Sequence, residues 1–213
     1  MVAGGFLADG TSSPRVDLYL PDQGRWRRLP DLPVAVNHAM AAAAGGRLYV
    51  VGGVGRGGLA RRMLALDPAR RRWRSLPGPT PRQHLAVTAW RRTLYAVAGR
   101  LSGFASNLRL VEAYAPAWGS WRRLPPLPEP RGGTGAAVAR GVIVSVGGEE
   151  PAGTIASVYG YDLGQGRWRR LPDLPTPRHG LGVAALRGRV YAVAGGTEPG
   201  LSVSAVNEVL DLG

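Results

Sequence analysis

The segment that decides the fold reads RWRRLPDLP and stands twice in the chain, at residues 25–33 and 167–175. Two close variants, RWRSLPGPT and SWRRLPPLP, occupy residues 72–80 and 120–128. The tryptophans of the four copies are 47, 48 and 47 residues apart, and a proline follows each of them four residues later. A fixed period of this length indicates a repeat architecture. The four tryptophans are Trp26, Trp73, Trp121 and Trp168.

A pair of glycines that ends an apolar run is a second marker of the same repeat. The pair reads Gly-Gly in four copies and Gly99-Arg100 in the third, and its first residues are 48, 47, 48 and 48 apart. Where the second glycine needs a positive φ, an arginine would be mildly strained, so we expect strain at Arg100. The four glycine pairs are Gly4-Gly5, Gly52-Gly53, Gly147-Gly148 and Gly195-Gly196.

Each unit of the repeat reads as four short strands. An alanine- and valine-rich run such as HLAVTAW precedes a tight turn, and a continuous apolar run such as TLYAVAG follows, as expected of a strand buried on both faces. A polar loop leads to a third strand, and the tryptophan segment is the fourth, whose terminal proline suits an outer edge. Four antiparallel strands at this period describe one blade of a β-propeller. We therefore expect a single all-β propeller domain over residues 1–213, with units at about 1–35, 36–82, 83–131, 132–178 and 179–213.

The strand pattern leaves the first and last blades incomplete. The chain starts inside a second strand and finishes after a third, so the first blade lacks its innermost strand and the last blade its outermost. The missing strands are consecutive in the repeat and correspond to about 22 residues, the length of residues 25–46. We expect an open arc with exposed strand edges, which a segment upstream of Met1 would close in the natural protein.

These residues resemble the kelch repeat. Its signature is a Gly-Gly pair after the second strand, an aromatic residue in the third strand and a tryptophan about 20 residues later, and the resemblance spans nearly the whole chain. It implies a kelch-type propeller of about five four-stranded blades. The second unit departs from the pattern, with Leu66 where other units carry Tyr19, Tyr114 and Tyr161.

Composition excludes several classes of protein and site. The chain has no cysteine, which excludes a disulfide framework, a thiolate nucleophile and a thiolate metal site. No apolar run approaches the ~20 residues of a membrane-spanning helix. The chain shows no secretory signal, so the compartment stays open between the cytoplasm and, for an N-terminally truncated chain, export.

The basic residues are all arginines. They number 27 and give a formal net charge of +13. Clustered arginines are typical of nucleic-acid binding, but the absence of lysine points first to the codon bias of a GC-rich genome. We therefore do not expect nucleic acid to be the partner, and we expect the arginines that flank the tryptophans to lie on the rim of the propeller.

Topology identifies a candidate binding face. The fourth-to-first and second-to-third loops share one end of each blade, and the second-to-third loops are the most dissimilar segments of the repeat. On this face the turns contribute Arg82, Arg131 and Arg178, whereas Val36 stands at the matching place in the first turn. Similar arginines line the peptide pocket of kelch adaptors of ubiquitin ligases. The resemblance implies that these three contact an anion or a carboxylate, and the alternative is that they brace the loops.

Carboxylates enter the same face from adjacent units. Glu149, Glu150 and Glu198 could hold a cationic or sugar ligand beside the arginines, or form ion pairs between blades, and the ion-pair interpretation is favoured. Asn107, in the third second-to-third loop, completes the candidate ligand-binding set.

Two further motifs receive structural interpretations. The three histidines, His38, His84 and His179, stand near the start of first strands, where hydrogen bonding within the turn is favoured over a metal site. Residues 53–58 fit Gly-x-Gly-x-x-Gly, with residues 59–66 as an alternative helix. The corresponding segment is a strand in every other unit, so these glycines are assigned to a surface loop and no cofactor is expected.

The leading functional hypothesis is a non-enzymatic module that binds a protein segment or a small polar ligand, including an anionic one, on the variable loops. No catalytic set of residues is evident. The alternative is an enzyme, because kelch-like bacterial propellers include a sialic-acid epimerase in which arginine and carboxylate residues hold a sugar acid. A third alternative is nucleic-acid binding through the arginine-rich rim.

Overall fold

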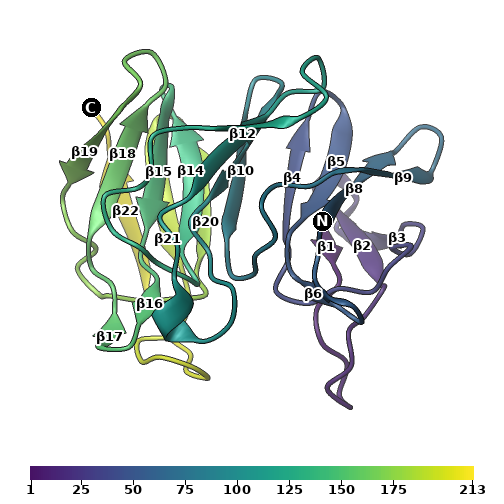
Figure 1. Cartoon of the computed structure of the whole chain (residues 1–213), viewed down its shortest axis with the longest axis horizontal. Helices are drawn as coiled ribbons and strands as arrows, with labels where there is room; N and C mark the ends of the chain where they lie inside the picture. Colours follow the sequence, from purple (N-terminus) through teal and green to yellow (C-terminus); the bar gives the residue numbers. More distant parts are fainter.

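Five small antiparallel sheets stand around a common axis in the computed structural model of the chain, which describes residues 1–213 (Figure 1). The three central sheets have four strands each, and the first and last have three. This arrangement confirms an all-β propeller whose first blade lacks the innermost strand and whose last blade lacks the outermost.

The five blades follow one another in chain order. Blades 2, 3 and 4 are complete, and a short hairpin lies in a second-to-third loop of two of them. Blade 1 contains β1 (Val2–Ala3), β2 (Val16–Leu20) and β3 (Arg25–Arg28); blade 2, β4 (Met40–Ala44), β5 (Arg47–Val51), β8 (Arg62–Asp67) and β9 (Arg72–Pro77), with the hairpin β6 (Val54–Gly55) and β7 (Gly58–Leu59); blade 3, β10 (Ala86–Trp90), β11 (Thr93–Val97), β12 (Val111–Tyr114) and β13 (Trp121–Arg123); blade 4, β14 (Gly135–Ala139), β15 (Val142–Val146), β18 (Val158–Asp162) and β19 (Arg167–Leu171), with the hairpin β16 (Glu149–Glu150) and β17 (Gly153–Thr154); and blade 5, β20 (Gly182–Leu186), β21 (Arg189–Val193) and β22 (Asn207–Asp211). Two 3-10 turns, η1 (Pro21–Gln23) and η2 (Phe104–Ser106), are the only helical segments.

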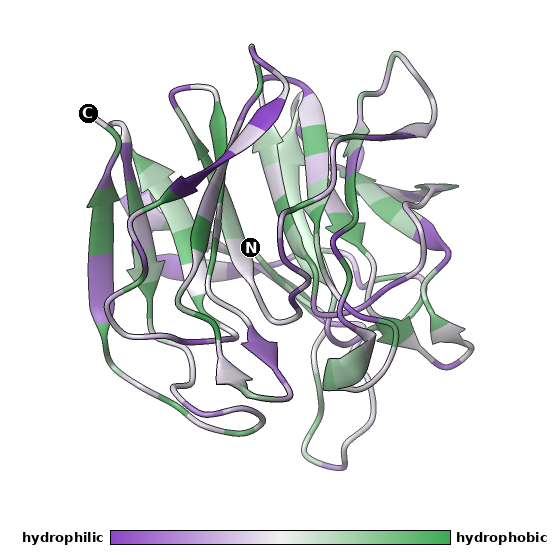
Figure 2. Ribbon diagram, turned by 60° about the vertical axis from the view of Figure 1, so that its left-hand side comes forward, coloured by the Kyte–Doolittle hydropathy of each residue, from purple (hydrophilic) through white to green (hydrophobic).

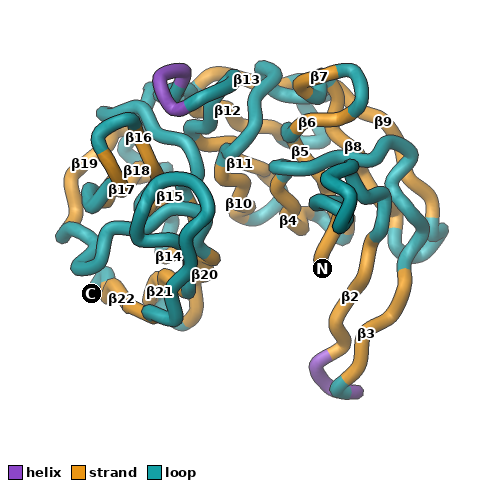
Figure 3. The backbone as a smooth tube through the Cα atoms, turned by 90° about the horizontal axis from the view of Figure 1, so that it is seen from below, coloured by secondary structure: helices purple, strands orange, loops and turns teal.

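The blades form an open arc. Blade 1 and blade 5 lie at its two ends, as the view in Figure 3 shows. The innermost strands pack side by side, β10 between β4 and β14, and β14 between β10 and β20. Their small side chains line a channel of about 300 Å³ along the axis, in which Thr88 is the only polar lining residue. Alanine and valine allow this close approach of the inner strands.

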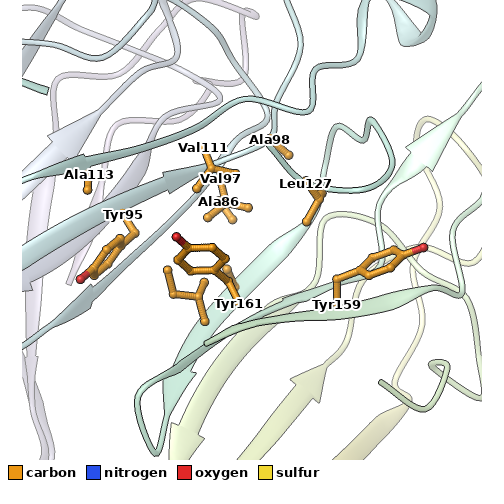
Figure 4. Close-up of a cluster of buried hydrophobic side chains, with 11 residues drawn as sticks. Ala86, Tyr95, Val97, Ala98, Val111, Ala113, Leu127, Tyr159 and Tyr161 are labelled. Carbon is orange, nitrogen blue, oxygen red and sulfur yellow. The ribbon is translucent and has the colours of Figure 1, made fainter. Parts of the chain in front are cut away.

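The hydrophobic core lies between blades. Each of four buried clusters joins two successive blades, so no blade has a core of its own. The cluster between blades 3 and 4 packs Val97 and Leu127 against Tyr159 and Tyr161 (Figure 4). Hydrophobic residues accordingly concentrate on the strands, as the hydropathy colours of Figure 2 show. Neighbouring blades therefore stabilise each other by burial of apolar surface.

The repeated tryptophan has a structural role that explains its period. The indole N–H of Trp73 donates to the carbonyl of Pro30 at 2.9 Å. Trp121 and Trp168 make the same bond to the proline of the preceding unit, at 3.0 and 2.9 Å. The Trp and Pro of each motif thus link the outer strands of blades 1 to 4 in series.

The glycine-pair alignment is wrong in two of the five units. The two left-handed residues are Ala98 and Gly99 in blade 3, with φ of 56° and 103°, and Ala194 and Gly195 in blade 5, with φ of 55° and 94°. The predicted pairs Gly99-Arg100 and Gly195-Gly196 therefore lie one residue after the true left-handed pairs, and Arg100 does not have a positive φ. The expected strain at Arg100 is therefore absent, and alanine replaces the first glycine instead.

The strands of blade 2 decide between the surface loop and the alternative helix at residues 53–66. Residues 53–60 form the β6–β7 hairpin and its flanks, and β8 follows as a strand, so the alternative helix over residues 59–66 does not form. No helix of the chain has the length and hydropathy needed to cross a membrane.

The turns between first and second strands place arginines in the left-handed region. Each turn has two residues. Arg140 and Gly141 have φ of 51° and 77°, and Arg187 and Gly188 have φ of 51° and 83°. Positive φ at both positions is the mark of a type I′ turn, which favours asparagine and glycine. Arginine at the first position therefore carries a conformational cost.

We expect Arg140→Asn to stabilise the fold by about 0.5–1 kcal/mol, because asparagine tolerates the left-handed region better than arginine. Urea denaturation measures the difference. Arg169→Asn, on the exposed strand β19, is the matched control and should give no gain, because asparagine is disfavoured in strands. A lower midpoint for Arg140→Asn than for the unaltered protein would show that the guanidinium contributes more than the backbone costs.

Candidate functional site

The candidate site lies on the face formed by the fourth-to-first and second-to-third loops, here called the variable-loop face. It is the lower side of the molecule in Figure 1, where the β6–β7 and β16–β17 hairpins and η2 project. The loops of this face differ in length and composition from blade to blade, whereas the strands beneath them are alike.

The arginines of the fourth-to-first turns are fully buried inside the blades. The guanidinium of Arg82 donates from Nε to the carbonyl of Ala98 at 2.7 Å and from Nη2 to the carbonyl of Ala96 at 3.2 Å. Its Nη1 donates to the carbonyl of Thr80 and pairs with the carboxylate of Glu112. Arg82 therefore fastens the turn to the second strand of its own blade and has no exposed donor.

The same arrangement recurs 96 residues later. Arg178 donates to the carbonyls of Ala194 and Ala192 at 2.9 and 3.1 Å, and to Glu208 at 2.5 Å. Burial raises the pKa of Glu208, but hydrogen bonds from Arg178 and Thr176 outweigh burial and leave that pKa below its usual value. The carboxylate is thus held ionised by the arginine that it balances.

In blade 4 the acidic partner of the buried arginine comes from the fourth-to-first turn and not from the third strand. Arg131 donates to the hydroxyl and the carbonyl of Ser157, both at 2.7 Å, and pairs with Glu129 of its own turn at 3.2 Å. Tyr159 stands where the other blades have their strand glutamate, and its hydroxyl donates to Glu129 at 2.8 Å. Each buried arginine therefore has one acidic partner, although the position of that partner changes.

Blade 2 replaces the whole ion pair by apolar residues. Val36 stands at the arginine position and Leu64 at the glutamate position, and both are buried in the core between blades 1 and 2. The charged and the apolar pair thus fill equivalent space. The three arginines brace the loops by these hydrogen bonds. None of them exposes an atom that a ligand could contact, so the interpretation that they contact an anion or a carboxylate has no support in this geometry.

We expect Glu112→Leu alone to destabilise the fold by about 3–5 kcal/mol, because it leaves the buried Arg82 unpaired. The double variant Arg82→Val with Glu112→Leu should recover more than half of that loss, since it copies the apolar pair of blade 2. Urea unfolding of the two variants measures the recovery. A double variant no more stable than Glu112→Leu would contradict the equivalence of the two pairs.

Glu149 is the centre of a second buried polar group. Its side chain is 1% exposed and pairs with Arg100 at 2.9 Å. The other carboxylate oxygen accepts the backbone N–H of Gly200 at 3.0 Å and lies 3.4 Å from Nδ1 of His179. Asn107 donates to the backbone carbonyl of Glu149 at 2.7 Å. This set, the Glu149 cluster, joins the variable loops of blades 3, 4 and 5.

Two histidines stack beside the Glu149 cluster. The rings of His38 and His84 lie 4.0 Å apart, and the ring of Phe6 meets His38 edge-on at 5.1 Å. Burial lowers the pKa of His84 to about 3, with the positive charges of His38, Arg100 and His179 adding to the effect. His84 is therefore neutral in the folded protein even under mildly acidic conditions, where a histidine in the unfolded chain is protonated.

Backbone hydrogen bonds ring the channel mouth on this face. The N–H of His84 donates to the carbonyl of His38 at 3.3 Å, that of Gly133 to His84 at 2.8 Å, and that of Gly180 to Gly133 at 2.8 Å. All four residues are left-handed, with φ between 48° and 66°. These bonds join the turns of successive blades through the backbone. The side chain of His38 bonds within its turn, with Nδ1 2.6 Å from Oδ1 of Asn37, whereas Nδ1 of His84 has no partner. The structure contains no group of three or more metal-binding side chains.

The structure brings together only part of the predicted ligand-binding set. Glu149 and Asn107 meet in the Glu149 cluster, whereas Glu150 and Glu198 are exposed on their loops. Arg100 was missed as a site residue because the shifted glycine alignment assigned it to the turn. Its position one residue after a turn glycine was the available signal.

Unsatisfied polar atoms and exposed apolar side chains coincide on this face. Nδ1 of His84, Nε of Arg100 and Oδ1 of Asn107 are buried without a hydrogen-bond partner. Buried polar atoms are rarely left unpaired, so these three mark the part of the site whose hydrogen bonding is least complete. Three variable loops also expose large apolar side chains, namely Phe6, Leu7, Leu101, Leu201 and Val203.

We expect stability to fall as the pH is lowered below about 6.5, because the unfolded chain takes up a proton at His84 that the folded chain does not. The folded pKa is the lower one, so the loss begins near the unfolded pKa and continues down to about 3. His84→Gln should flatten part of the decline in urea midpoint between about pH 7 and pH 5. An unchanged slope would show that His84 is protonated in the folded protein.

Comparison with known proteins agrees with the geometry. Residues 35–80 and 130–175 each match a family described as the Kelch motif. The chain is 33% identical over 166 residues to Kelch-like protein 35 of Mus musculus, which covers 76% of this chain and 27% of that protein. It is 34% identical over 147 residues to Kelch repeat and BTB domain-containing protein 13 of Homo sapiens, covering 65% and 31%. The chain thus spans about a third or less of the length of these relatives.

A solved structure titled "Structure of YjhT" has the same fold. It superposes with a TM-score of 0.81 over 98% of this chain and 76% of that one, at 14% sequence identity. At this identity the likeness concerns the arrangement of the blades and not the side chains of the site.

Proposed function

Because the chain belongs to the kelch-repeat family, whose propellers generally serve as protein-interaction modules, we propose that it binds a protein segment on the variable-loop face. The segment would lie over the Glu149 cluster, between the loops of blades 1, 3 and 5. Binding requires no catalytic step, and the buried residues of the cluster hold the loops in place for it.

The exposed apolar side chains of three variable loops carry this proposal. Leu201 is fully exposed, and Phe6 and Leu101 are 57% and 46% exposed. Large apolar side chains at loop tips lose solvent-exposed area only when another molecule covers them. They surround polar groups that are rigidly held, which is the combination of an apolar patch and fixed hydrogen-bonding groups found at protein interfaces.

The small-ligand and enzyme alternatives have less support. Both rest on arginines that hold an acid, and Arg82, Arg131 and Arg178 are fully buried against their own blades. Arg100 is also buried, and its Nη1 is paired with Glu149; Nε of Arg100 and Nε of Arg131 are both buried without a partner. A protein segment would contact the exposed loop tips, whereas a sugar acid would need a guanidinium that is buried in this structure.

Selection from a random peptide display library tests the proposal. Peptides selected on the unaltered protein should bind the triple variant Phe6→Ser, Leu101→Ser and Leu201→Ser at least about tenfold more weakly. Their affinity for the control variant Leu186→Ser with Val209→Ser, which changes exposed apolar residues of blade 5 elsewhere, should stay within about twofold.

Two results would contradict the proposal. Peptides that lose affinity for the control and keep it for the loop variant would place binding outside the variable-loop face. A rise in melting temperature with N-acetylneuraminic acid, together with no enrichment of peptides, would favour the sugar-acid alternative.

A further inference from the structure

The opposite end of the propeller carries a concentration of positive charge. This turn face consists of the first-to-second and third-to-fourth turns and forms the upper side of Figure 1, and several of its turns are hydrophilic (purple) in Figure 2. Three successive first-to-second turns, in blades 3, 4 and 5, contribute exposed arginines around the axis. We call them the arginine collar: Arg91, Arg92, Arg140 and Arg187.

No carboxylate neutralises the collar. The acidic residues at this end of blades 2, 4 and 5 are Asp67, Asp162 and Asp211. Asp67 and Asp162 accept backbone N–H groups of their own turns. Asp211 pairs with Arg189 at 2.9 Å. None of the collar arginines forms an ion pair in the structure. Hydrogen bonds from Arg189 and Gly213 lower the pKa of Asp211, and the charge of Arg140 adds a smaller effect, so only Arg140 is partly balanced by this carboxylate.

The collar arginines reach across to neighbouring turns. A Cβ at Gly188 would lie 2.7 Å from Nε of Arg140, and one at Gly45 would lie 3.6 Å from Nε of Arg92. The guanidinium groups of Arg92 and Arg140 therefore lie over a turn of the adjacent blade, in room that a glycine leaves. The charges consequently form one surface that bridges blades instead of separate points.

A hollow lies at the edge of the collar. It has a volume of about 580 Å³ and opens between blades 3 and 4. Arg91 and Arg140 line it together with the half-buried ring of Trp90, the buried Tyr95 and Asp162, whose carboxylate accepts backbone N–H groups of its own turn. This size accommodates one or two side chains, and two guanidinium groups beside a single carboxylate suit one further carboxylate.

The backbone at three of these arginines is in an unfavourable conformation. Arg91, Arg140 and Arg187 have φ of 54°, 51° and 51°, where glycine or asparagine is preferred. A cost of this kind, repeated in three successive blades, is accepted where the side chain has a role that a smaller residue could not fill. The exposed guanidinium is the one property that distinguishes arginine at these positions.

We infer that the arginine collar binds an acidic protein segment, with aspartate or glutamate side chains on the collar and one carboxylate in the hollow. Protein is favoured over nucleic acid because the charge is compact and the hollow has the size of a side chain. Single-stranded nucleic acid is held by successive exposed aromatic rings, and the hollow offers one half-buried tryptophan. The collar is at the opposite end from the variable loops, so it is independent of the proposed function.

Fluorescence anisotropy with a labelled peptide of about ten glutamates, at about 50 mM salt, tests the inference. The triple variant Arg91→Asn, Arg140→Asn and Arg187→Asn should bind the peptide at least about tenfold more weakly. Its melting temperature should not fall, because asparagine suits the left-handed positions, so weaker binding would not reflect unfolding. The control variant Arg25→Asn, Arg74→Asn and Arg169→Asn removes the same charge from the outer strands and should stay within about twofold.

Three results would overturn the inference. Absence of peptide binding by the unaltered protein up to about 1 mM would show that the collar is not a binding surface. Equal losses in the two triple variants would assign binding to net charge. Tighter binding of a single-stranded oligonucleotide of similar charge, lost in the collar variant, would assign the surface to nucleic acid.

Discussion

The buried arginine of the fourth-to-first turn is the interaction on which three of the blades depend. Its side chain holds the end of the second strand of its own blade, and its backbone carbonyl accepts an N–H from the preceding blade. Gly53 donates to Arg82 in this way at 2.9 Å, and Gly148 to Arg178 at 2.8 Å. One residue thereby fixes two blades at the point where each variable loop begins. The loops can differ in length and composition because their first residues are held by this bond.

The sequence predicted the fold because its markers reflect interactions that recur in each blade. The tryptophan period was readable because each indole bonds to a proline one unit earlier. The glycine pair was misplaced at Ala98 and Ala194 because alanine can also take the left-handed position there. The sequence could not decide whether Arg82 contacts a ligand or braces its loop, since its burial depends on carbonyls 14 and 16 residues away that a single sequence does not place together. Likewise, nothing in the spacing of Arg100 and Glu149 predicted that they pair across blades.

The two ends of the propeller differ in their chemistry. All six glutamates stand at or near the variable-loop end of their strands, and the acids of the turn face are aspartates that shape turns or pair locally. The arginines that are free of carboxylates concentrate at the other end and on the outer strands. The net charge of +13 is therefore distributed unevenly between the two ends of the propeller. The resulting electric field would orient an approaching charged partner before contact.

The tryptophan-to-proline bonds also make the two ends of the arc differ in mechanical strength. They join blade 2 to blade 1, blade 3 to blade 2 and blade 4 to blade 3, whereas blade 5 has no outer strand to make such a bond to blade 4. Blade 5 is attached to blade 4 by the apolar core, the inner strands and hydrogen bonds of the variable-loop face, with no bond between outer strands. Under tension applied at the two termini, blade 5 would detach at a lower force than the blades whose rims are bonded, and the remaining blades would then come apart as a series of separate rupture events.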